Sequence, residues 1–205
     1  MTPPLFLNKP YKYRVILGSA SPRREQLLSG LDIPFTVQPV PDLNENDYPS
    51  GLSPYEIPEW LARAKSAAFP RDLEPDELLI TADTLVFCGE GVLGKPASAG
   101  EAYKMLSVLS DRPHQVITGV FLRTSDHVLA GETGIGFSDI TTVWFAPLSE
   151  QEITYYIEKY KPFDKAGAYG VQEWIGYAGI ERIEGSYFNV MGLPVHKLWR
   201  YLSTL

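Results

Sequence analysis

Two arginines follow a serine-containing turn in the segment Gly18-Ser19-Ala20-Ser21-Pro22-Arg23-Arg24. The amino end of a helix has unpaired N–H groups and a partial positive charge, so each arginine in its first turn costs about 0.3–1 kcal/mol. The same N–H groups, hydroxyls and guanidinium groups could converge on a phosphate. A solvated arginine pair is the alternative, and the phosphate-loop spacing G-x-x-x-x-G-K-[ST] is absent. The segment alone leaves both interpretations open.

A second candidate is Asp83, which interrupts the apolar run Leu78–Cys88. Aspartate is disfavoured in strands, and a buried carboxylate without a partner is costly. Such a side chain could hold a divalent metal or accept a proton from water. A structural aspartate bonded to a loop is the alternative.

Two lysines occur where they could meet an anion. Lys95 lies in Gly94-Lys95-Pro96, where the proline stiffens the loop and the glycine permits a turn. Lys65 lies on an expected amphipathic helix. For both, a solvated or snorkelling side chain is the commoner outcome. Each lysine is therefore a weak signal by itself.

The stretch Asp164–Gln172 combines small residues with an amide at its end. Small residues let a backbone approach a ligand closely, and Gln172 offers a donor and an acceptor that suit the edge of a base. A glycine-rich connector is the simpler explanation if the stretch is taken alone. The sequence has no G-x-S-x-G elbow and no metal-ligand spacing among its three histidines.

These candidates need strands and helices to position them. Ser98 with Glu101 and Ser149 with Glu152 predict capping boxes at two helix starts. Glycine-rich loops are expected before a strand near 179–183. The alternation of elements and one hairpin predict an α/β fold with a mixed twisted sheet. Strands are expected over 13–17, 35–40, 78–88, 92–93, 114–123 and 136–146, and helices over 21–29, 55–69, 98–109, 149–160 and from 194.

The bulk properties indicate a soluble protein. We expect a loose tail over residues 1–11 and a single domain over residues 12–205. The net charge of −7 argues against broad nucleic-acid binding, which needs a basic face. No apolar run suits a signal peptide or a membrane span, and the single cysteine, Cys88, fits a reducing compartment. The sequence predicts a cytoplasmic protein with neither nucleic acid nor membrane as a partner.

Taken together, the segments resemble the Maf family of nucleoside triphosphate pyrophosphatases. They occur in family order from Val15 to about Leu198. The resemblance implies flanking helices on a mixed sheet and two lobes that enclose a central cleft, as in Maf and inosine-triphosphatase-like proteins. The segments that carry it are Ser19–Arg24, Leu61-Ala62-x-x-Lys65, Ala82-Asp83-Thr84, Gly94-Lys95-Pro96, Asp164–Gln172 and Gly185–Pro194.

The resemblance also implies an activity and roles for particular residues. The family cleaves a nucleoside triphosphate between its α- and β-phosphates, which releases the monophosphate and pyrophosphate. Asp83 matches the proton acceptor for the attacking water. The other matches are phosphate-pocket residues (Ser19, Arg24 and the catalytic lysines Lys65 and Lys95) and substrate-selection residues (Arg23, Thr84 and Gln172).

A divalent cation, Mg²⁺, Mn²⁺ or Co²⁺, is implied as the cofactor, with Asp83 as a ligand. The family tends to place glutamates after its second strand, whereas this chain has Pro41-Asp42-Leu43-Asn44-Glu45. Either Asp42 or Glu45 could complete the metal site. The run Tyr169–Gln172 is similar to the branch that prefers dTTP and UTP, with modified pyrimidine nucleotides as further candidates, rather than to the 7-methyl-GTP branch.

Three other expectations accompany this reading. Maf-type proteins have been linked to septum formation, so the alternative function is a nucleotide-binding regulator of cell division without significant turnover. A phosphatase that releases orthophosphate is a weaker alternative. A homodimer is expected, both as the commonest assembly and by the resemblance.

Overall fold

The computed structural model describes residues 12–41, 43, 47–125 and 134–205, so the expected tail over residues 1–11 lies outside the described residues. The chain forms two compact units. Unit 1 comprises Met1–Asp83, Thr118–Asp139 and Gly192–Leu205, and unit 2 comprises Thr84–Ile117 and Ile140–Met191. The boundary falls within three long strands, β3 (Glu77–Cys88), β5 (Pro113–Thr124) and β6 (Ile135–Phe145).

A mixed sheet of seven strands runs through the fold in the order β2-β1-β3-β5-β6-β7, and β4 (Gly91–Leu93) pairs with β3. β1 (Arg14–Leu17) is parallel to both β2 (Phe35–Val37) and β3, with Val15 opposite Phe35 and Leu78. The β3–β4 and β6–β7 pairs are antiparallel. The predicted mixed α/β fold is therefore confirmed, and the implied cleft stays a prediction.

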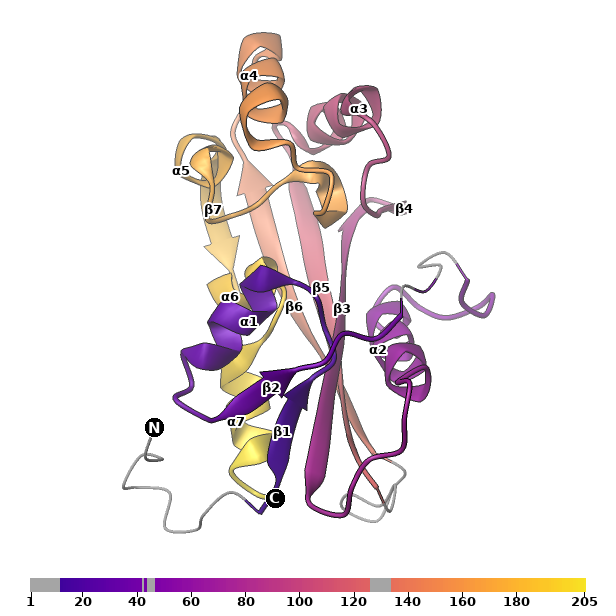
Figure 1. The fold of residues 1–205 in the computed structure, drawn as a ribbon. Coiled ribbons are helices and arrows are strands. Elements are labelled where there is room, and N and C mark those ends of the chain that lie inside the picture. The colour runs from indigo at the N-terminus through magenta and orange to yellow at the C-terminus, as the bar shows by residue number, and fades with distance from the viewer. Residues whose placement is uncertain (1–11, 42, 44–46, 126–133) are drawn as a thin grey trace. The chain divides into compact units, whose positions relative to one another are not determined.

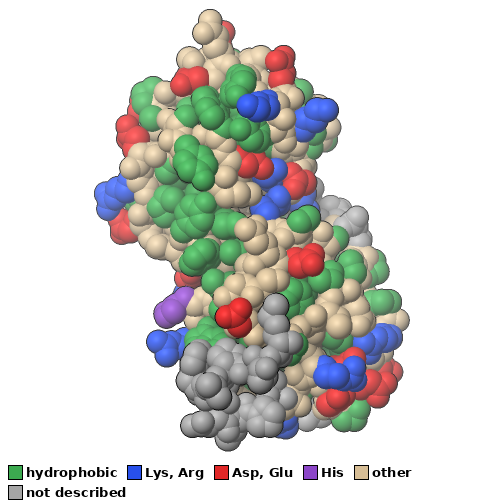
Figure 2. Space-filling view, turned by 60° about the vertical axis from the view of Figure 1, so that its left-hand side comes forward, with side chains coloured by type: hydrophobic (Ala, Val, Ile, Leu, Met, Phe, Trp, Pro, Cys, Tyr) green, Lys and Arg blue, Asp and Glu red, His purple; other side chains and the backbone are tan. Residues whose placement is uncertain are grey.

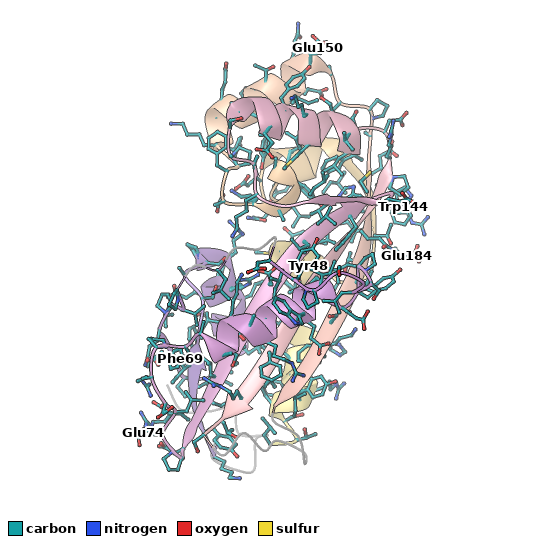
Figure 3. All side chains as sticks on the ribbon, turned by 90° about the vertical axis from the view of Figure 1, so that its right-hand side faces the viewer. Tyr48, Phe69, Glu74, Trp144, Glu150 and Glu184 are labelled. Atoms are coloured by element: carbon teal, nitrogen blue, oxygen red, sulfur yellow. The ribbon has the colours of Figure 1, made fainter. Side chains whose placement is uncertain are left out.

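Unit 1 covers its part of the sheet with helices on both faces. α2 (Ile57–Ala67) lies on one face, and α1 (Pro22–Ser29) and α7 (Val195–Leu202) lie on the other (Figure 1). Both faces of β3 are consequently buried, which explains its nearly continuous apolar sequence. One core cluster joins Ile16 and Leu79 to Phe69 and Leu73, which follow α2; Figure 3 labels Phe69.

Gly119 of β5 sets how closely α2 approaches the sheet. A Cβ atom at this position would overlap the backbone of Pro58 and Glu59 at the start of α2. Because glycine has no Cβ, the helix can lie directly on the strand. This close approach fixes the depth at which the side chains of α2 meet β3.

Unit 2 contains the remaining helices. α3 (Ala99–Leu109) packs against α4 (Glu150–Tyr160) and against the short 3-10 turn η1 (Ala166–Ala168). Ser149 and Glu152 form the complete predicted capping box. Ser98 accepts from the Glu101 N–H as predicted, but the Glu101 carboxylate accepts from the Ala97 N–H instead of completing the box.

Two short helices occupy residues for which the sequence predicted no helix. α5 (Trp174–Gly179) precedes β7 (Ile180–Glu184), and α6 (Tyr187–Met191) follows it. α5 contains two glycines, which disfavour helix, but a Cβ at Gly176 would overlap the carbonyl oxygen of Val171. Close packing therefore outweighs intrinsic propensity here. No helix in the described part of the chain is long and apolar enough to span a bilayer.

Candidate active site

The loop between β1 and α1 lies beside β3 within unit 1. The Gly18 N–H donates to the Ile80 carbonyl at 2.8 Å, and a Cβ at Gly18 would lie 2.9 Å from Thr81 Cγ2. Ser21 and Pro22 occupy the N-cap and first helical positions, as predicted. The Ser21 side chain makes no capping hydrogen bond, and Ser19 Oγ accepts from the Ser21 N–H at 3.2 Å. The loop is therefore held by the neighbouring strand.

The two arginines of this segment differ in their surroundings. Arg24 Nε donates to the Gly192 carbonyl at 2.8 Å, and its Nη1 lies 3.5 Å from Ser19 Oγ. Arg24 is thus attached to the turn before α7, and Arg23 is half-buried. Gly192 has φ +116°, a conformation that favours glycine. These contacts exclude a simple solvated pair.

Asp83 and Lys65 form an ion pair within unit 1. Lys65 Nζ bonds to Asp83 Oδ1, and only 13% of the Lys65 side chain and 3% of the Asp83 side chain are exposed. Thr81 lies two residues before Asp83 on the same face of β3, and its hydroxyl donates to the Ala62 carbonyl of α2 at 2.7 Å. Ala62 and Lys65 are three residues apart on α2, so they face the strand together. Lys65 therefore points inward and does not snorkel.

The parallel pairing of β1 and β3 places these two groups near one another in unit 1. Leu17 is opposite Ile80, so Ser19 lies just beyond the carboxyl end of β1, and Asp83 lies three residues past Ile80 within β3. Carboxyl ends of parallel strands are common ligand sites. The described structure thus brings a serine-rich turn, two arginines, a lysine and a buried carboxylate to one end of unit 1.

Asp83 is the one predicted metal ligand that the structure describes. Among the described residues, no three histidine, cysteine, aspartate or glutamate side chains are grouped so that they could hold a metal ion. Mg²⁺ usually keeps several waters and takes one or two carboxylates together with substrate phosphates. A single buried carboxylate fits that requirement. Asp42 and Glu45 lie outside the described residues.

The predicted residues of unit 2 lie on two loops that contact each other. The Gly167 N–H donates to the Gly94 carbonyl at 3.0 Å, which joins the Gly94-Lys95-Pro96 turn to the stretch Asp164–Gln172. Lys95 is exposed and Pro96 is buried, whereas Thr84, the first residue of unit 2, is half-buried. The hydrogen bond and the buried proline therefore hold the turn that carries Lys95, whose role stays a prediction.

Gln172 presents a polar atom with no hydrogen-bond partner among the described residues. The residue is half-buried, but its Oε1 atom is fully buried and makes no hydrogen bond to any described residue. Buried acceptors are nearly always satisfied, so such an atom is a candidate for contact with a ligand donor. Gln172 Oε1 is therefore available to accept from a ligand, and its binding role stays a prediction.

Sequence reasoning missed a group of buried polar side chains around this stretch. Lys165 and Tyr156 are almost fully buried, and both contact the Glu173 carboxylate. His114 is 2% exposed, and its Nε2 lies 2.8 Å from the Tyr169 hydroxyl. The adjacent polar pair Asp164-Lys165 was visible in the sequence, but nothing in its spacing indicated Tyr156 or His114 as neighbours.

His114 should make stability depend on pH. Burial lowers the pKa of His114 from 6.5 to about 4, so the unfolded chain binds a proton between these values that the folded chain does not. Stability is then fully present above pH 6.5 and falls as the pH drops toward 4, by about 3 kcal/mol. Urea unfolding of His114→Gln across this range should show a shallower loss than the wild-type protein. The exposed His196, replaced in the same way, should leave the slope unchanged; equal slopes for wild type and His114→Gln would contradict the prediction.

A separate groove of about 360 Å³ lies on unit 2 beside α5 and β7. Figure 2 shows hydrophobic side chains gathered on this face. Tyr177, which lines the groove, is 84% exposed. The groove is lined by Val171, Gly176, Tyr177, Ile180 to Ile183 and Tyr187. No sequence-predicted site residue is among them, so the groove is not where the predicted chemistry would occur.

Comparison with known proteins agrees with the resemblance seen in the sequence. Residues 14–205 match the family described as Maf-like protein. Similar curated relatives include a dTTP/UTP pyrophosphatase of Parabacteroides distasonis, 54% identical over 94% of this chain and 96% of that protein. Another dTTP/UTP pyrophosphatase, of Porphyromonas gingivalis, is 51% identical over 94% of each chain.

One solved structure has a weaker likeness. It is a nucleoside-triphosphatase, also named dITP/XTP pyrophosphatase, of Mycobacterium abscessus. It is 14% identical, covers 66% of this chain and 75% of its own, and has a TM-score of 0.36. A likeness at this level supports no conclusion about the present chain.

Proposed function

The chain belongs to the Maf-like protein family, and from that premise we propose that it is a nucleoside triphosphate pyrophosphatase acting on dTTP and UTP. It hydrolyses the bond between the α- and β-phosphates and releases a nucleoside monophosphate and pyrophosphate. Modified pyrimidine nucleotides are further candidate substrates. The observation that carries the proposal is the buried Asp83–Lys65 pair beside the Ser19–Arg24 turn.

Asp83 accepts a proton from the attacking water in this proposal. The water oxygen forms a bond to phosphorus, the bond to the pyrophosphate oxygen breaks, and one proton passes to the Asp83 carboxylate. Burial supports this role because a carboxylate kept from bulk water has few competing partners. Lys65, bonded to the same carboxylate, holds it in one orientation.

In this proposal, cationic side chains bind the phosphates and offset their negative charge during the reaction. Displacement at phosphorus is accelerated mainly by positioning and by neutralising the charge of the phosphates. We assign Ser19, Arg24, Lys65 and Lys95 to the phosphates. Arg23 and Thr84 are assigned to substrate selection. The half-buried setting of both arginines supports these assignments, because a guanidinium group is strongest as a phosphate ligand when partly desolvated.

Asp83 would also hold the divalent cation that this chemistry calls for, Mg²⁺, Mn²⁺ or Co²⁺. When bound, the cation supplies positive charge that offsets charge on the phosphate oxygens. Asp42 or Glu45 is proposed as a second ligand. The buried Asp83 carboxylate supports a metal that is shared with the substrate.

Gln172 is assigned to the base. Its buried Oε1 can accept the N3–H of uracil or thymine, while its amide group can donate to a base carbonyl. Cytosine has an unprotonated N3, so at that position Oε1 would face an acceptor and not a donor. The unsatisfied acceptor therefore supports a preference for dTTP and UTP over CTP.

Product analysis separates this function from its alternatives. Purified protein incubated with UTP and Mg²⁺ should release UMP and pyrophosphate in equal amounts, measured by chromatography. Binding of UTP without product would favour the regulator of cell division, which the enzyme names of the curated relatives make less favoured. Release of orthophosphate as the first product would favour a phosphatase.

Lys95→Ala should weaken the handling of triphosphate more than that of monophosphate. The reason is that Lys95 is assigned to the β- or γ-phosphate, which UMP lacks. We expect KM for UTP to rise about tenfold, the effect of losing one charged hydrogen bond, while the inhibition constant of UMP stays the same. Lys104→Ala, which removes another exposed lysine of unit 2, is the matched control and should change neither constant. Equal losses for both ligands would argue against contact between Lys95 and these phosphates.

Three broader features belong to the same proposal. The enzyme occupies a single domain over residues 12–205. We place it in the cytoplasm, where its nucleotide substrates occur, and we expect it to act without nucleic acid or membrane. A homodimer is the proposed assembly.

A further inference from the structure

Two buried side chains and one half-buried side chain of unit 2 form a hydrogen-bonded group that the proposed chemistry does not use. We call Tyr156, Lys165 and Glu173 the Tyr156 cluster. Tyr156 is fully buried on α4, and Lys165 is 8% exposed. The Tyr156 hydroxyl donates to Glu173 Oε2, and Lys165 Nζ lies 3.0 Å from Glu173 Oε1. Both carboxylate oxygens of Glu173 are therefore engaged.

The Tyr156 cluster holds both ends of the turn that carries Gln172. The Gly170 N–H donates to the Tyr156 hydroxyl at 3.0 Å, and the Glu173 N–H donates to the Gly170 carbonyl at 3.0 Å. One hydroxyl thus connects the first residue of the turn to the side chain of the last. Gln172 lies between these two fixed residues.

Packing removes the remaining freedom of the turn. Val171 is 5% exposed, and the missing Cβ of Gly176 leaves room for the Val171 carbonyl against α5. A Cβ at Gly170 would lie 3.0 Å from both the Glu173 and Lys165 side chains. The backbone on each side of Gln172 is therefore enclosed by the Tyr156 cluster and by α5.

This rigidity explains how Gln172 Oε1 can remain buried without a partner in the part of the chain that the structure describes. An amide on a mobile turn would rotate to reach water or a protein donor, because an unsatisfied buried acceptor is unfavourable. Here the turn is fixed, so the acceptor is kept in place for a donor that arrives with the ligand. Fixing a group in its binding orientation lowers the entropy cost of binding.

We propose that Tyr156 and Glu173 are positioning residues that fix the direction of the Gln172 amide and thereby set the preference of the enzyme among nucleotide bases. The inference rests on the proposed function, since it concerns the base of the same substrate. Neither residue touches the substrate. Their effect on base choice passes through Gln172.

Tyr156→Phe tests this directly, because it removes one hydroxyl and keeps the ring. The ratio of kcat/KM for UTP to that for CTP should fall about three- to tenfold, which corresponds to one hydrogen bond. The change should appear in KM for UTP, with kcat little altered, because the phosphate chemistry is untouched. Tyr155→Phe is the matched control, since it removes an exposed hydroxyl of the same helix that bonds to Lys159. Its ratio should equal that of the wild-type protein.

A double-mutant cycle with Gln172→Ala shows whether Tyr156 acts through Gln172. Gln172→Ala should lower the ratio by itself, and adding Tyr156→Phe to it should lower the ratio no further. A further fall in the double variant, or an equal loss for UTP and CTP in Tyr156→Phe, would overturn the proposal. An unchanged ratio in Tyr156→Phe would overturn it as well.

Glu173→Gln provides a second variant should Tyr156→Phe fail to fold. It retains an acceptor for Tyr156 and removes the charge opposite Lys165, and the same fall in ratio is expected. Unfolding of both variants, judged by circular dichroism, would make the cluster a stability element and overturn the proposal. Failure of the proposed function is seen separately, as absence of UMP and pyrophosphate from the wild-type protein with every nucleotide.

Discussion

Replacing Asp83 by asparagine should lower kcat for UTP or dTTP by about 10²–10⁴-fold, the usual contribution of a positioned general base. The amide has nearly the same shape as the carboxylate but cannot accept the proton of the attacking water. Nucleotide affinity, measured as the Kd of a non-hydrolysable UTP analogue, should change much less. Pyrophosphate release under saturating UTP gives the rate.

Asp76→Asn is the control for this substitution. Asp76 directly precedes β3, the strand that contains Asp83. The exposed Asp76 carboxylate pairs with Arg14 at 2.7 Å. Removing that charge should leave kcat unchanged. Near-normal turnover by Asp83→Asn would show that another group accepts the proton. A loss of the same size in both variants would point to a general electrostatic effect.

Replacing Lys65 by methionine should destabilise the folded protein strongly. The substitution keeps most of the side-chain volume but leaves the Asp83 carboxylate, 2% exposed, without its cationic partner. Breaking a buried ion pair by removing one member costs about 3–5 kcal/mol. Urea unfolding followed by circular dichroism measures the loss.

The structure supplies both a rescue and a control for the Lys65 variant. Adding Asp83→Asn to Lys65→Met removes the buried charge, so the double variant should be more stable than Lys65→Met alone. Lys197→Met breaks the pair with Asp139, in which the lysine is 47% exposed, and should cost less than about 1 kcal/mol. A double variant no more stable than Lys65→Met would mean that the buried charge is not the cause.

Local patterns predicted the regular elements well. The apolar run Leu78–Cys88 is a strand buried on both faces, and Ser149 with Glu152 starts a helix with the expected capping box. These features depend on side-chain periodicity and on hydrogen bonds between residues three apart, both of which the sequence displays directly. Helices α5 and α6 were missed because packing and tertiary hydrogen bonds hold them against propensity: the glycines of α5 pack on Val171 and Leu148, and Asn189 of α6 donates to Val116 and Thr141.

The sequence by itself determined the α/β class and the residue types of the candidate site. The ordered motifs from Ser19 to Pro194 also indicated the family, which the comparison confirmed. For single residues it left the alternatives open: Lys65 could have snorkelled, and Asp83 could have been bonded to a loop. Which alternative holds depends on a tertiary contact with a residue far along the chain. The spacing of residues in a sequence does not reveal that contact.

Tertiary structure decided the contacts. Lys65 bonds to Asp83, which is 18 positions away in the chain. Tyr156 bonds to Glu173 and to Gly170, the residues on either side of the turn that carries Gln172. The physical reason is the same in both places. A buried polar group must find a partner or incur a large desolvation cost, and which partner is within reach depends on how helices lie on the sheet. The absence of a Cβ atom lets α2 lie close to the sheet at Gly119 and lets α5 lie close to the Val171 carbonyl at Gly176.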